Sequence, residues 1–383
     1  MNTNFKSIIL HLNLISNIGP LLILKLVDLV GLQNLQNLYG YSVADFISLG
    51  FSESKSQILV NGLADKLLLE QELDLIEKHQ VEIVTYWCFE YSRLLSEIHV
   101  PPVILYCQGN VALLKHDKMI ACVGARKARL YTKDALAQIV GPMIQEGWIV
   151  VSGGAIGADR YAHELALNLK KSTIVVVGSG LCHQYPPTNK DLFERILYEN
   201  SLIVSCFPMG RKPDLTTFPI RNRIISGLSL GCLVVQAALK SGALITAQQA
   251  LDQGREVFAV PGSLFDPLSA GCHELIKQGA QLVASSEDIL AGFGLLCSGV
   301  GESIKNNEQL TMFSQKISDH IVPTRYQQGS LERLILDILI RPMSADHIMQ
   351  KVDIDLVAVQ NLLFSLSLEG LVMQDSMGFW SLR

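Results

Sequence analysis

Seven short apolar runs between residues 120 and 283 constrain the fold of this chain more than any other feature. They are rich in valine, isoleucine and leucine, and longer segments with helix-forming patterns separate them. We predict strands at Ile120–Val123, Ile149–Val151, Ile174–Val177, Leu202–Ser205, Leu233–Val235, Val257–Val260 and Gln281–Val283. Continuous apolar runs are typical of strands buried on both faces. Because helices alternate with them, the sequence predicts an α/β fold with a parallel sheet between two helical layers.

The segments on either side of this region follow other patterns. Residues 1–80 predict a small domain of short amphipathic helices, similar to a SAM or helix-hairpin-helix domain, with a turn at Gly19-Pro20. Little basic charge lies beside that turn, which favours docking against protein over DNA binding. Residues 81–118 predict a bridge with strand-like segments at 83–86 and 103–106, so the second domain spans residues 81–294.

The carboxyl-terminal part predicts a linker and a small domain. Residues 295–329 are polar and predict a linker, and residues 330–383 predict three helices followed by a two-stranded wing, as in a winged helix. Its expected recognition helix, residues 355–368, contains no lysine or arginine. A DNA-reading helix without cations is improbable, which favours a protein-docking or regulatory role.

Charge is distributed unevenly along the chain. The net charge is −5, but residues 96–328 hold 21 Lys and Arg against 19 Asp and Glu, so the flanks carry the acidic excess. Four cations lie within residues 126–133 without an acid, and four more lie within residues 211–223 with only Asp214 opposing them. Such clusters on an acidic protein indicate a phosphate-bearing partner.

The richest stretch for function is 218–246. Arg221 and Arg223 lie near the start of a predicted helix, where cations oppose the helix dipole, so a bound anion is one explanation for them. Phe218 precedes them and offers a stacking face, and Lys240 opens a turn into another helix. An aromatic side chain beside a cationic track is typical of single-stranded nucleic-acid binding. Surface arginines at a plain helix start are the alternative interpretation.

Other site chemistries fit this sequence poorly. No G-x-G-x-x-G fingerprint or Walker A lysine is present. Asp159 is explained more simply as a helix cap than as a catalytic group, and His163 as a satisfied neighbour of that cap. The eight cysteines form no C-x-x-C pair, and no apolar stretch approaches a membrane span. We therefore expect a cytoplasmic protein without metal, cofactor or membrane association.

Several motifs in order resemble the DprA/Smf family, the DNA-processing protein of bacterial transformation. They are Val123-Gly124-Ala125-Arg126-Lys127, Val151-Ser152-Gly153-Gly154-Ala155-x-Gly157-Ala158-Asp159, Gly178-Ser179-Gly180-Leu181 with Tyr185-Pro186, Phe218-Pro219-x-Arg221-Asn222-Arg223, Lys240-Ser241-Gly242-Ala243-Leu244-Ile245-Thr246 and Val260-Pro261-Gly262. The resemblance covers about residues 95–290, and the flanking domains match longer members of the family. Ala125 and Gly154 depart from the usual motifs, where the family has a serine and a leucine.

The resemblance implies a function as well as a fold. It implies an extended Rossmann-like domain that binds single-stranded DNA, forms a homodimer through that domain and loads the RecA recombinase during DNA uptake (natural transformation) and recombination, without catalysis. Nothing in the sequence resembles a base-edge reader, so binding should be independent of sequence.

Two groups of residues are expected at the DNA site. The DNA-binding residues are Arg126, Lys127, Phe218, Arg221, Asn222, Arg223, Lys240, Ser241, Gly242 and Thr246. The loops of a phosphate cradle are marked by Gly124, Ser152, Gly153, Gly154, Gly157, Gly178, Ser179 and Gly180. The alternative is a nucleotide-binding enzyme or sensor of the phosphoribohydrolase-like Rossmann class. Pro261-Gly262-Ser263 begins that class's motif and then departs from it.

Overall fold

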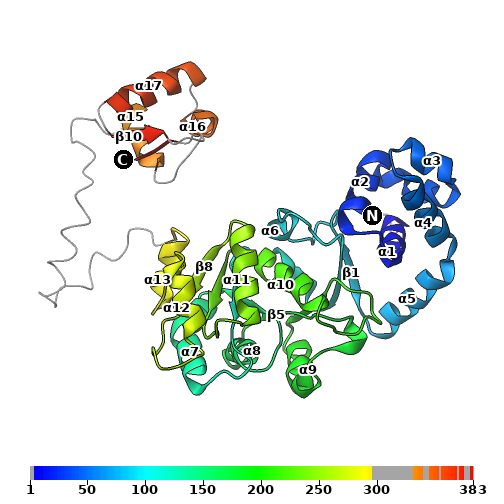
Figure 1. Ribbon diagram of the computed structural model, residues 1–383, viewed down its shortest axis with the longest axis horizontal. Coiled ribbons are helices and arrows are strands. Elements are labelled where there is room, and N and C mark those ends of the chain that lie inside the picture. The colour runs from blue at the N-terminus through cyan, green and yellow to red at the C-terminus, as the bar shows by residue number, and fades with distance from the viewer. Residues whose placement is uncertain are drawn as a thin grey trace, which may run out of the picture. The chain divides into compact units, whose positions relative to one another are not determined.

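The computed structural model describes residues 4–295, 331–339, 345–352, 355–368, 371–374 and 380–382. Backbone contacts divide the chain into two compact units, Met1–Cys297 and Ser298–Arg383. The larger unit carries the nine-stranded sheet (Figure 1). Among the described residues, no helix is long and apolar enough to cross a bilayer.

One nine-stranded sheet forms the centre of the larger unit, within residues 4–295. Its strand order is β1-β2-β6-β5-β4-β3-β7-β8-β9. The strands are β1 (Glu82–Thr85), β2 (Ile104–Gly109), β3 (Met119–Val123), β4 (Ile149–Ser152), β5 (Thr173–Val176), β6 (Leu202–Ser205), β7 (Gly231–Val234), β8 (Glu256–Ala259) and β9 (Gln281–Leu282). From β6 to β9 all neighbouring strands are parallel. The predicted α/β fold is confirmed, and β3 to β9 lie at the seven apolar runs that predicted them.

The parallel sheet has an antiparallel extension that the sequence pattern did not reveal. β2 pairs antiparallel with β6, and β1 pairs antiparallel with β2. The segments predicted only as a bridge therefore belong to the sheet. Parallel neighbours need a crossover connection, usually a helix. Between β1 and β2 the chain forms only α6 (Arg93–Ser96), and it returns in the opposite direction.

Helices cover both faces of the sheet. Alternate strand residues point to opposite faces, so each strand contributes to two cores. One face packs against α6, α10 (Thr217–Leu228), α11 (Gly242–Asp252) and α12 (Ala270–Lys277). The other packs against α7 (Leu130–Gln145), α8 (Ala158–Asn168), α9 (Lys190–Tyr198) and α13 (Ser286–Gly292). Short 3-10 helices complete the connections at η2 (Val111–Lys115), η3 (Leu181–His183) and η4 (Pro187–Asn189).

The order of connection creates a switch point beside β3. From β3 the chain moves outward through β4, β5 and β6, and then returns to place β7 on the other side of β3. Loops after β3 and β7 diverge there, and open α/β sheets bind ligands in the crevice that results. The topology therefore directs attention to the carboxyl ends of these two strands.

The amino-terminal helices pack against the sheet rather than standing apart. They are α1 (Asn4–Leu14), α2 (Pro20–Val30), η1 (Leu32–Gly40), α3 (Val43–Ser48), α4 (Glu53–Ala64) and α5 (Lys66–Lys78). Their apolar residues share one core with α9 and the β2, β5 and β6 strands. Glu72 of α5 is buried there, and its Oε1 accepts a hydrogen bond from the Met209 N–H at 2.7 Å. Burial raises the pKa of the Glu72 carboxyl.

The smaller unit contains helices and a hairpin in its described residues. The elements are α15 (Leu331–Ile338), α16 (Ala345–Val352), α17 (Leu356–Leu368), β10 (Val372–Gln374) and β11 (Trp380–Leu382). The two strands pair antiparallel, and the helices enclose a core of leucine, isoleucine and valine. This order matches the elements predicted for a winged helix, an assignment that stays a prediction. The predicted linker, 295–329, lies outside the described residues beyond Leu295.

Candidate functional site

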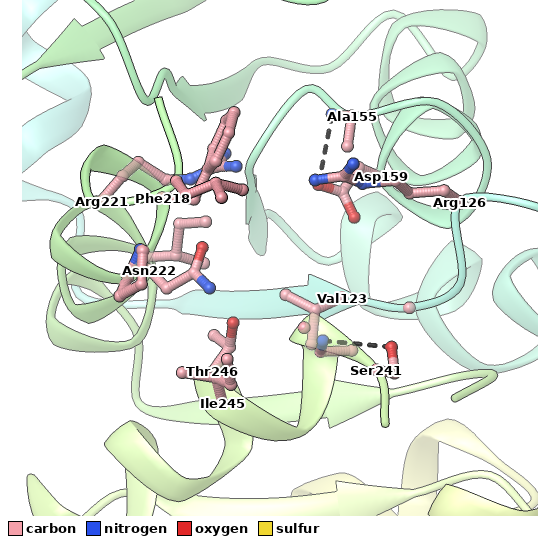
Figure 2. Close-up of a pocket in the computed structure, with 16 residues that line it drawn as sticks. Val123, Arg126, Ala155, Asp159, Phe218, Arg221, Asn222, Ser241, Ile245 and Thr246 are labelled. Atoms are coloured by element: carbon pink, nitrogen blue, oxygen red, sulfur yellow. Dashed lines mark hydrogen bonds between the residues drawn. The ribbon is translucent and has the colours of Figure 1, made fainter. Parts of the chain in front are cut away.

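A pocket of about 400 Å³ opens at the carboxyl ends of β3 and β7 (Figure 2). We call it the switch-point pocket. It is lined by Val123, Gly124, Arg126, Ala155, Asp159, Leu215, Phe218, Pro219, Arg221, Asn222, Ile225, Ser241, Gly242, Ala243, Ile245 and Thr246. Segments more than a hundred residues apart in sequence thus meet at the edge where the topology predicts a ligand crevice.

Two helix starts shape one side of this pocket. Asp214 fixes the start of α10, since its Oδ1 accepts hydrogen bonds from the N–H groups of Thr216 and Thr217 at 2.7 and 3.1 Å. Ser241 caps α11, since its Oγ accepts a hydrogen bond from the Ala243 N–H at 3.3 Å. These caps satisfy amide groups that a helix start leaves without partners. They also fix the positions from which Phe218 and Thr246 reach the pocket.

Arg126 and Phe218 form the open rim of the pocket. The Arg126 guanidinium carbon lies 5.7 Å from the centre of the Phe218 ring, within cation–π range. Arg126 is exposed, and in the part of the chain that the structure describes it forms no ion pair with a carboxylate. By contrast, Arg129 and Arg211 pair with Asp266 and Asp214. Arg126 is thus a cation available to a ligand.

The interior of the pocket is mostly apolar. Val123, Pro219, Ile225 and Ala243 line it together with the polar side chains of Asn222 and Thr246. Such a cavity accepts a flat, largely apolar group, while the cation at its rim accepts an anion. A nucleobase with its phosphate combines these two properties.

Arg221 plays a structural part that the sequence pattern did not indicate. Its side chain borders the pocket, but the residue is only 6 % exposed. Its Nη1 donates hydrogen bonds to the carbonyl oxygens of Gly153 and Val176 at 2.5 and 2.7 Å. Burial lowers the pKa of the Arg221 guanidinium, and Asp159 opposes that shift. We therefore reassign Arg221 from phosphate contact to support of the pocket floor.

Asp159 occupies the place where an anion was expected. Its Oδ2 accepts hydrogen bonds from the N–H groups of Gly153 and Ala155 at 3.1 and 3.3 Å. Burial raises the pKa of the Asp159 carboxyl, and the nearby Arg221 cation acts in the opposite direction. The loop after β4 therefore binds the protein's own carboxylate, and its N–H groups at these two positions are not available to a phosphate.

The predicted phosphate cradle needs correction. All of its residues except Gly124 are buried: Ser152, Gly153, Gly154, Gly157, Gly178, Ser179 and Gly180. The glycines allow close packing instead. A Cβ at Gly153 would lie 1.9 Å from Arg221 Nη1, and one at Gly178 would lie 2.8 Å from the Phe218 ring. Gly124 alone of this group borders the switch-point pocket.

The remaining predicted DNA-binding residues separate into two groups. Asn222, Ser241, Gly242 and Thr246 line the pocket, and exposed Lys240 lies beside it in a neighbouring groove. Lys127 is exposed outside the lining.

Arg223 needs correction, because it is directed elsewhere. Its Nη1 donates a hydrogen bond to the Val100 carbonyl, and burial lowers the pKa of its guanidinium. Residues 221 and 223 are about 200° apart around a helix of 3.6 residues per turn, so both cannot face one pocket. We therefore do not assign Arg223 to the DNA site.

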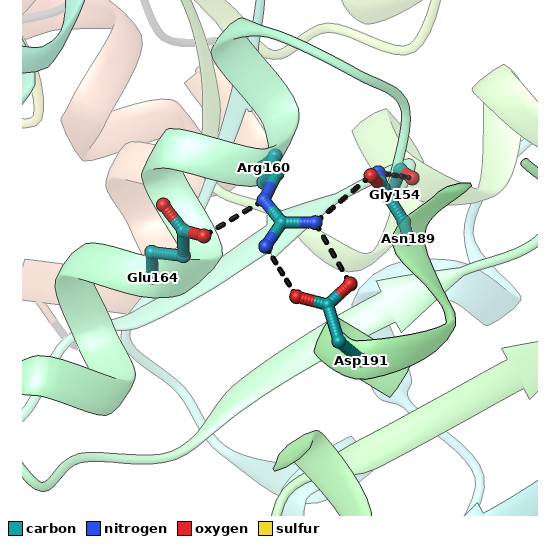
Figure 3. A network of polar contacts seen from close by, with 5 residues as sticks. All are labelled: Gly154, Arg160, Glu164, Asn189 and Asp191. Atoms are coloured by element: carbon teal, nitrogen blue, oxygen red, sulfur yellow. Dashed lines mark hydrogen bonds and ion pairs between the residues drawn. The ribbon is translucent and has the colours of Figure 1, made fainter. Parts of the chain in front are cut away.

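A polar network holds the glycine loop beside the pocket (Figure 3). Arg160 donates hydrogen bonds to Glu164 at 2.7 Å, to Asn189 at 3.1 Å and to Asp191 at 2.5 and 3.0 Å. Asn189 in turn donates to the Gly154 carbonyl at 2.9 Å. The hydrogen bond from Arg160 lowers the pKa of Asp191. This cation therefore links α8 to α9 and is not free for a ligand.

Tyr185 is a site residue that sequence reasoning missed. Its ring centre lies 5.9 Å from that of Phe218, and it lines a small cavity of about 40 Å³ on the other side of Phe218. Tyr185 and Pro186 belong to one of the motifs described above, which was the available signal. Nothing in the local pattern indicates that the loop after β5 reaches Phe218.

His163 is a buried base whose neutral form the fold requires. Thr173 Oγ1 donates to the Val150 carbonyl at 2.8 Å, so it accepts the Nδ1–H of His163, also at 2.8 Å. It thus bonds with Thr173 rather than with the helix cap expected from the sequence. Burial lowers the pKa of His163 to about 3, and the Arg221 cation adds to this shift.

We expect stability to fall on acidification because of His163. Its folded-state pKa is depressed, so between about pH 6.5 and pH 3 the unfolded chain takes up a proton that the folded protein excludes. The loss should approach ~1.4 kcal/mol per pH unit. Urea unfolding at pH 7 and pH 4.5 should show a smaller loss for His163→Asn than for the wild type. An equal loss in both proteins would contradict this assignment.

The comparison with known proteins matches the region that contains the sheet and the switch-point pocket. Residues 82–294 match the family described as DNA recombination-mediator protein A. The DNA processing protein DprA of Bacillus subtilis is 44% identical over 200 residues, which cover 52% of this chain and 67% of that protein.

No groups of histidine, cysteine, aspartate and glutamate that could hold a metal ion occur among the described residues.

Two solved structures are similar to this one. The X-ray structure of DprA from Streptococcus pneumoniae has a TM-score of 0.65 and 32% identity, covering 76% of this chain and 98% of that one. The structure of DNA processing protein A from Helicobacter pylori has a TM-score of 0.51 and 29% identity, covering 56% and 95%. The H. pylori protein has a single-stranded DNA binding mode that is described as unique.

Proposed function

Because this chain belongs to the DNA recombination-mediator protein A family, which includes proteins named DprA and Smf, we propose that it binds single-stranded DNA in the switch-point pocket. The observation that carries the proposal is the exposed Arg126 guanidinium against the Phe218 ring, at the mouth of an apolar cavity. The DNA-binding relative from H. pylori supports the choice of ligand.

Each part of the pocket has a role in this proposal. One base enters the apolar cavity and stacks on Phe218, and Arg126 and Lys240 neutralise phosphates at the rim. Asn222 and Thr246 hydrogen-bond to whichever polar edge the base presents. Binding is independent of sequence, because stacking and phosphate contacts supply most of its free energy and every base has a flat face.

No catalytic step is part of the proposal. Asp159 is engaged by Gly153, Ala155 and the field of Arg221, and the Nδ1 of His163 is bonded to Thr173. Both side chains serve the fold. The protein acts as a mediator that holds a strand and delivers it to the RecA recombinase during DNA uptake and recombination in the cytoplasm.

The proposed homodimer uses the β9 end of the sheet. The β1 edge lies against α1, where Lys6 Nζ donates a hydrogen bond to the Ile83 carbonyl at 3.0 Å. At the other edge, Leu282 of β9 is 49% exposed. Among the described residues no strand pairs with the outer side of this two-residue strand, and Leu282 presents an apolar side chain there. We place the contact between two copies at β9.

The direct test is the affinity for oligo-dT and for a duplex of equal length across a salt series. We expect tighter binding to oligo-dT, with log K falling linearly against log salt at a slope of about −0.7 per phosphate contacted. A flat salt response, or equal affinity for the duplex, would contradict the proposal. Thermal stabilisation by mononucleotides but not by oligonucleotides would favour the nucleotide-binding alternative instead.

A further inference from the structure

Three large apolar side chains are exposed in the segments that follow β3 and β8. Phe265 is 95% exposed and Leu264 is 86% exposed, in the loop that follows β8. Leu130, at the start of α7, is 75% exposed. Single exposed apolar residues are common, but a group of large ones at one place indicates an interaction surface.

The loop that carries Phe265 is held in a defined shape. Asp266 Oδ1 accepts a hydrogen bond from the Leu268 N–H at 3.0 Å, and Ser263 Oγ accepts one from the Phe265 N–H at 3.2 Å. Gln236, after β7, donates to Asp266 Oδ2 at 3.2 Å. Phe265 is therefore presented to solvent by a loop that is bonded on both sides of it.

The same loop is joined to the basic segment after β3. Arg129 pairs with Asp266 at 3.5 Å, and the Tyr131 hydroxyl donates a hydrogen bond to the Pro261 carbonyl at 2.5 Å. These contacts place Phe265 next to the segment that carries Arg126, Lys127 and Lys133. All three cations are exposed.

The spacing between the loops after β3 and β8 suits a nucleic-acid strand. β8 is two strands away from β3, and neighbouring strands are about 4.8 Å apart, so the two loops begin about 10 Å apart. Stacked nucleotides rise about 3.4 Å each, so about three of them span this gap. A polyanion with flat bases complements a row of cations that ends in an aromatic ring.

We propose that the DNA strand continues from the switch-point pocket along the carboxyl edge of the sheet, and that Phe265 is a second stacking platform at its far end. Lys127 and Lys133 contact the phosphates between the two platforms. This inference rests on the proposed function, and it assigns the loop after β8 to the DNA interface.

The test compares variants of the full-length protein for binding to fluorescein-labelled dT20. Phe265→Ala should weaken binding by about fivefold to 150-fold, the range expected for one stacked base. Phe265→Trp should retain the affinity, and dT20 should quench its fluorescence beyond any quenching seen in the wild type. Tyr198→Ala is the matched control, since Tyr198 is a 90% exposed aromatic residue. It ends α9 just before β6 begins, so it lies at the amino ends of the parallel strands, opposite to the proposed DNA track.

The outcomes separate this inference from the proposed function. If the wild type does not bind dT20, both fail. If Phe218→Ala lowers the affinity but Phe265→Ala does not, only the extended track fails. Two further results for Phe265→Ala, each with unchanged dT20 affinity, would also overturn the extended track. Loss of binding to phosphatidylglycerol vesicles would indicate that Phe265 contacts a membrane surface. A changed sedimentation coefficient of the variant would indicate that Phe265 contacts a second copy of the chain.

Discussion

Replacement of Arg126 by glutamate is expected to lower the affinity for oligo-dT by roughly two orders of magnitude without changing the melting temperature. The substitution removes a charge-assisted hydrogen bond to phosphate worth ~1.5–3 kcal/mol and adds repulsion of the DNA backbone. Arg126 is exposed and its guanidinium lies against the Phe218 ring, so the fold does not depend on it. Fluorescence anisotropy in a salt series should also show a shallower slope for the variant.

Arg93→Glu is the matched control for this experiment. Arg93 lies on α6, its side chain is 88% exposed, and its reversal changes the net charge by the same amount. A general electrostatic effect would weaken both variants equally, whereas a contact in the pocket weakens only Arg126→Glu. Equal affinities of Arg126→Glu and the wild type would move the DNA site elsewhere.

Replacement of Arg221 by methionine is expected to destabilise the protein by ~3–5 kcal/mol. Breaking a buried charge pair leaves the remaining charge without compensation. Here Asp159 would keep a buried carboxylate, and the carbonyl oxygens of Gly153 and Val176 would lose their donor. Calorimetry should show a melting temperature lower by about 6 °C or more.

Two comparisons identify the cause of that loss. Arg126→Met makes the same substitution at the exposed arginine and should leave the melting temperature unchanged. Combining Arg221→Met with Asp159→Asn should recover part of the stability, since the second change removes the uncompensated charge. If Arg221→Met alone melts at the same temperature as the wild type, Arg221 does not support the pocket floor.

The sequence carried enough information for the parallel core of the sheet. Strands such as Ile149–Ser152 and Leu202–Ser205 are buried on both faces, so their composition alone marks them. β1 and β2 have similar composition, but their direction depends on which strand they pair with. Pairing between Tyr106 and Ser205 is a long-range property that no local pattern encodes.

For the site, the order of the strands correctly predicted that the loops after β3 and β7 meet. The clusters of cations did not predict which arginines are free to bind a ligand. Arg126 and Thr246 follow adjacent strands and do meet in the pocket. Arg221, Arg223 and Arg126 are the same residue type, yet one is buried against carbonyl groups, one donates to Val100 and one is exposed. Which arginine is free depends on the tertiary structure. For the same reason, glycine-rich turns suggested a phosphate cradle where glycines instead allow close packing.

The contact between Gly178 and Phe218 couples two positions forty residues apart. A Cβ at position 178 would collide with the ring. The proposed stacking platform can therefore persist in descendants of this chain only while position 178 has no side chain. An alanine there would select for a smaller or displaced residue at 218, so the two positions should be inherited as a pair, although only Phe218 lines the switch-point pocket.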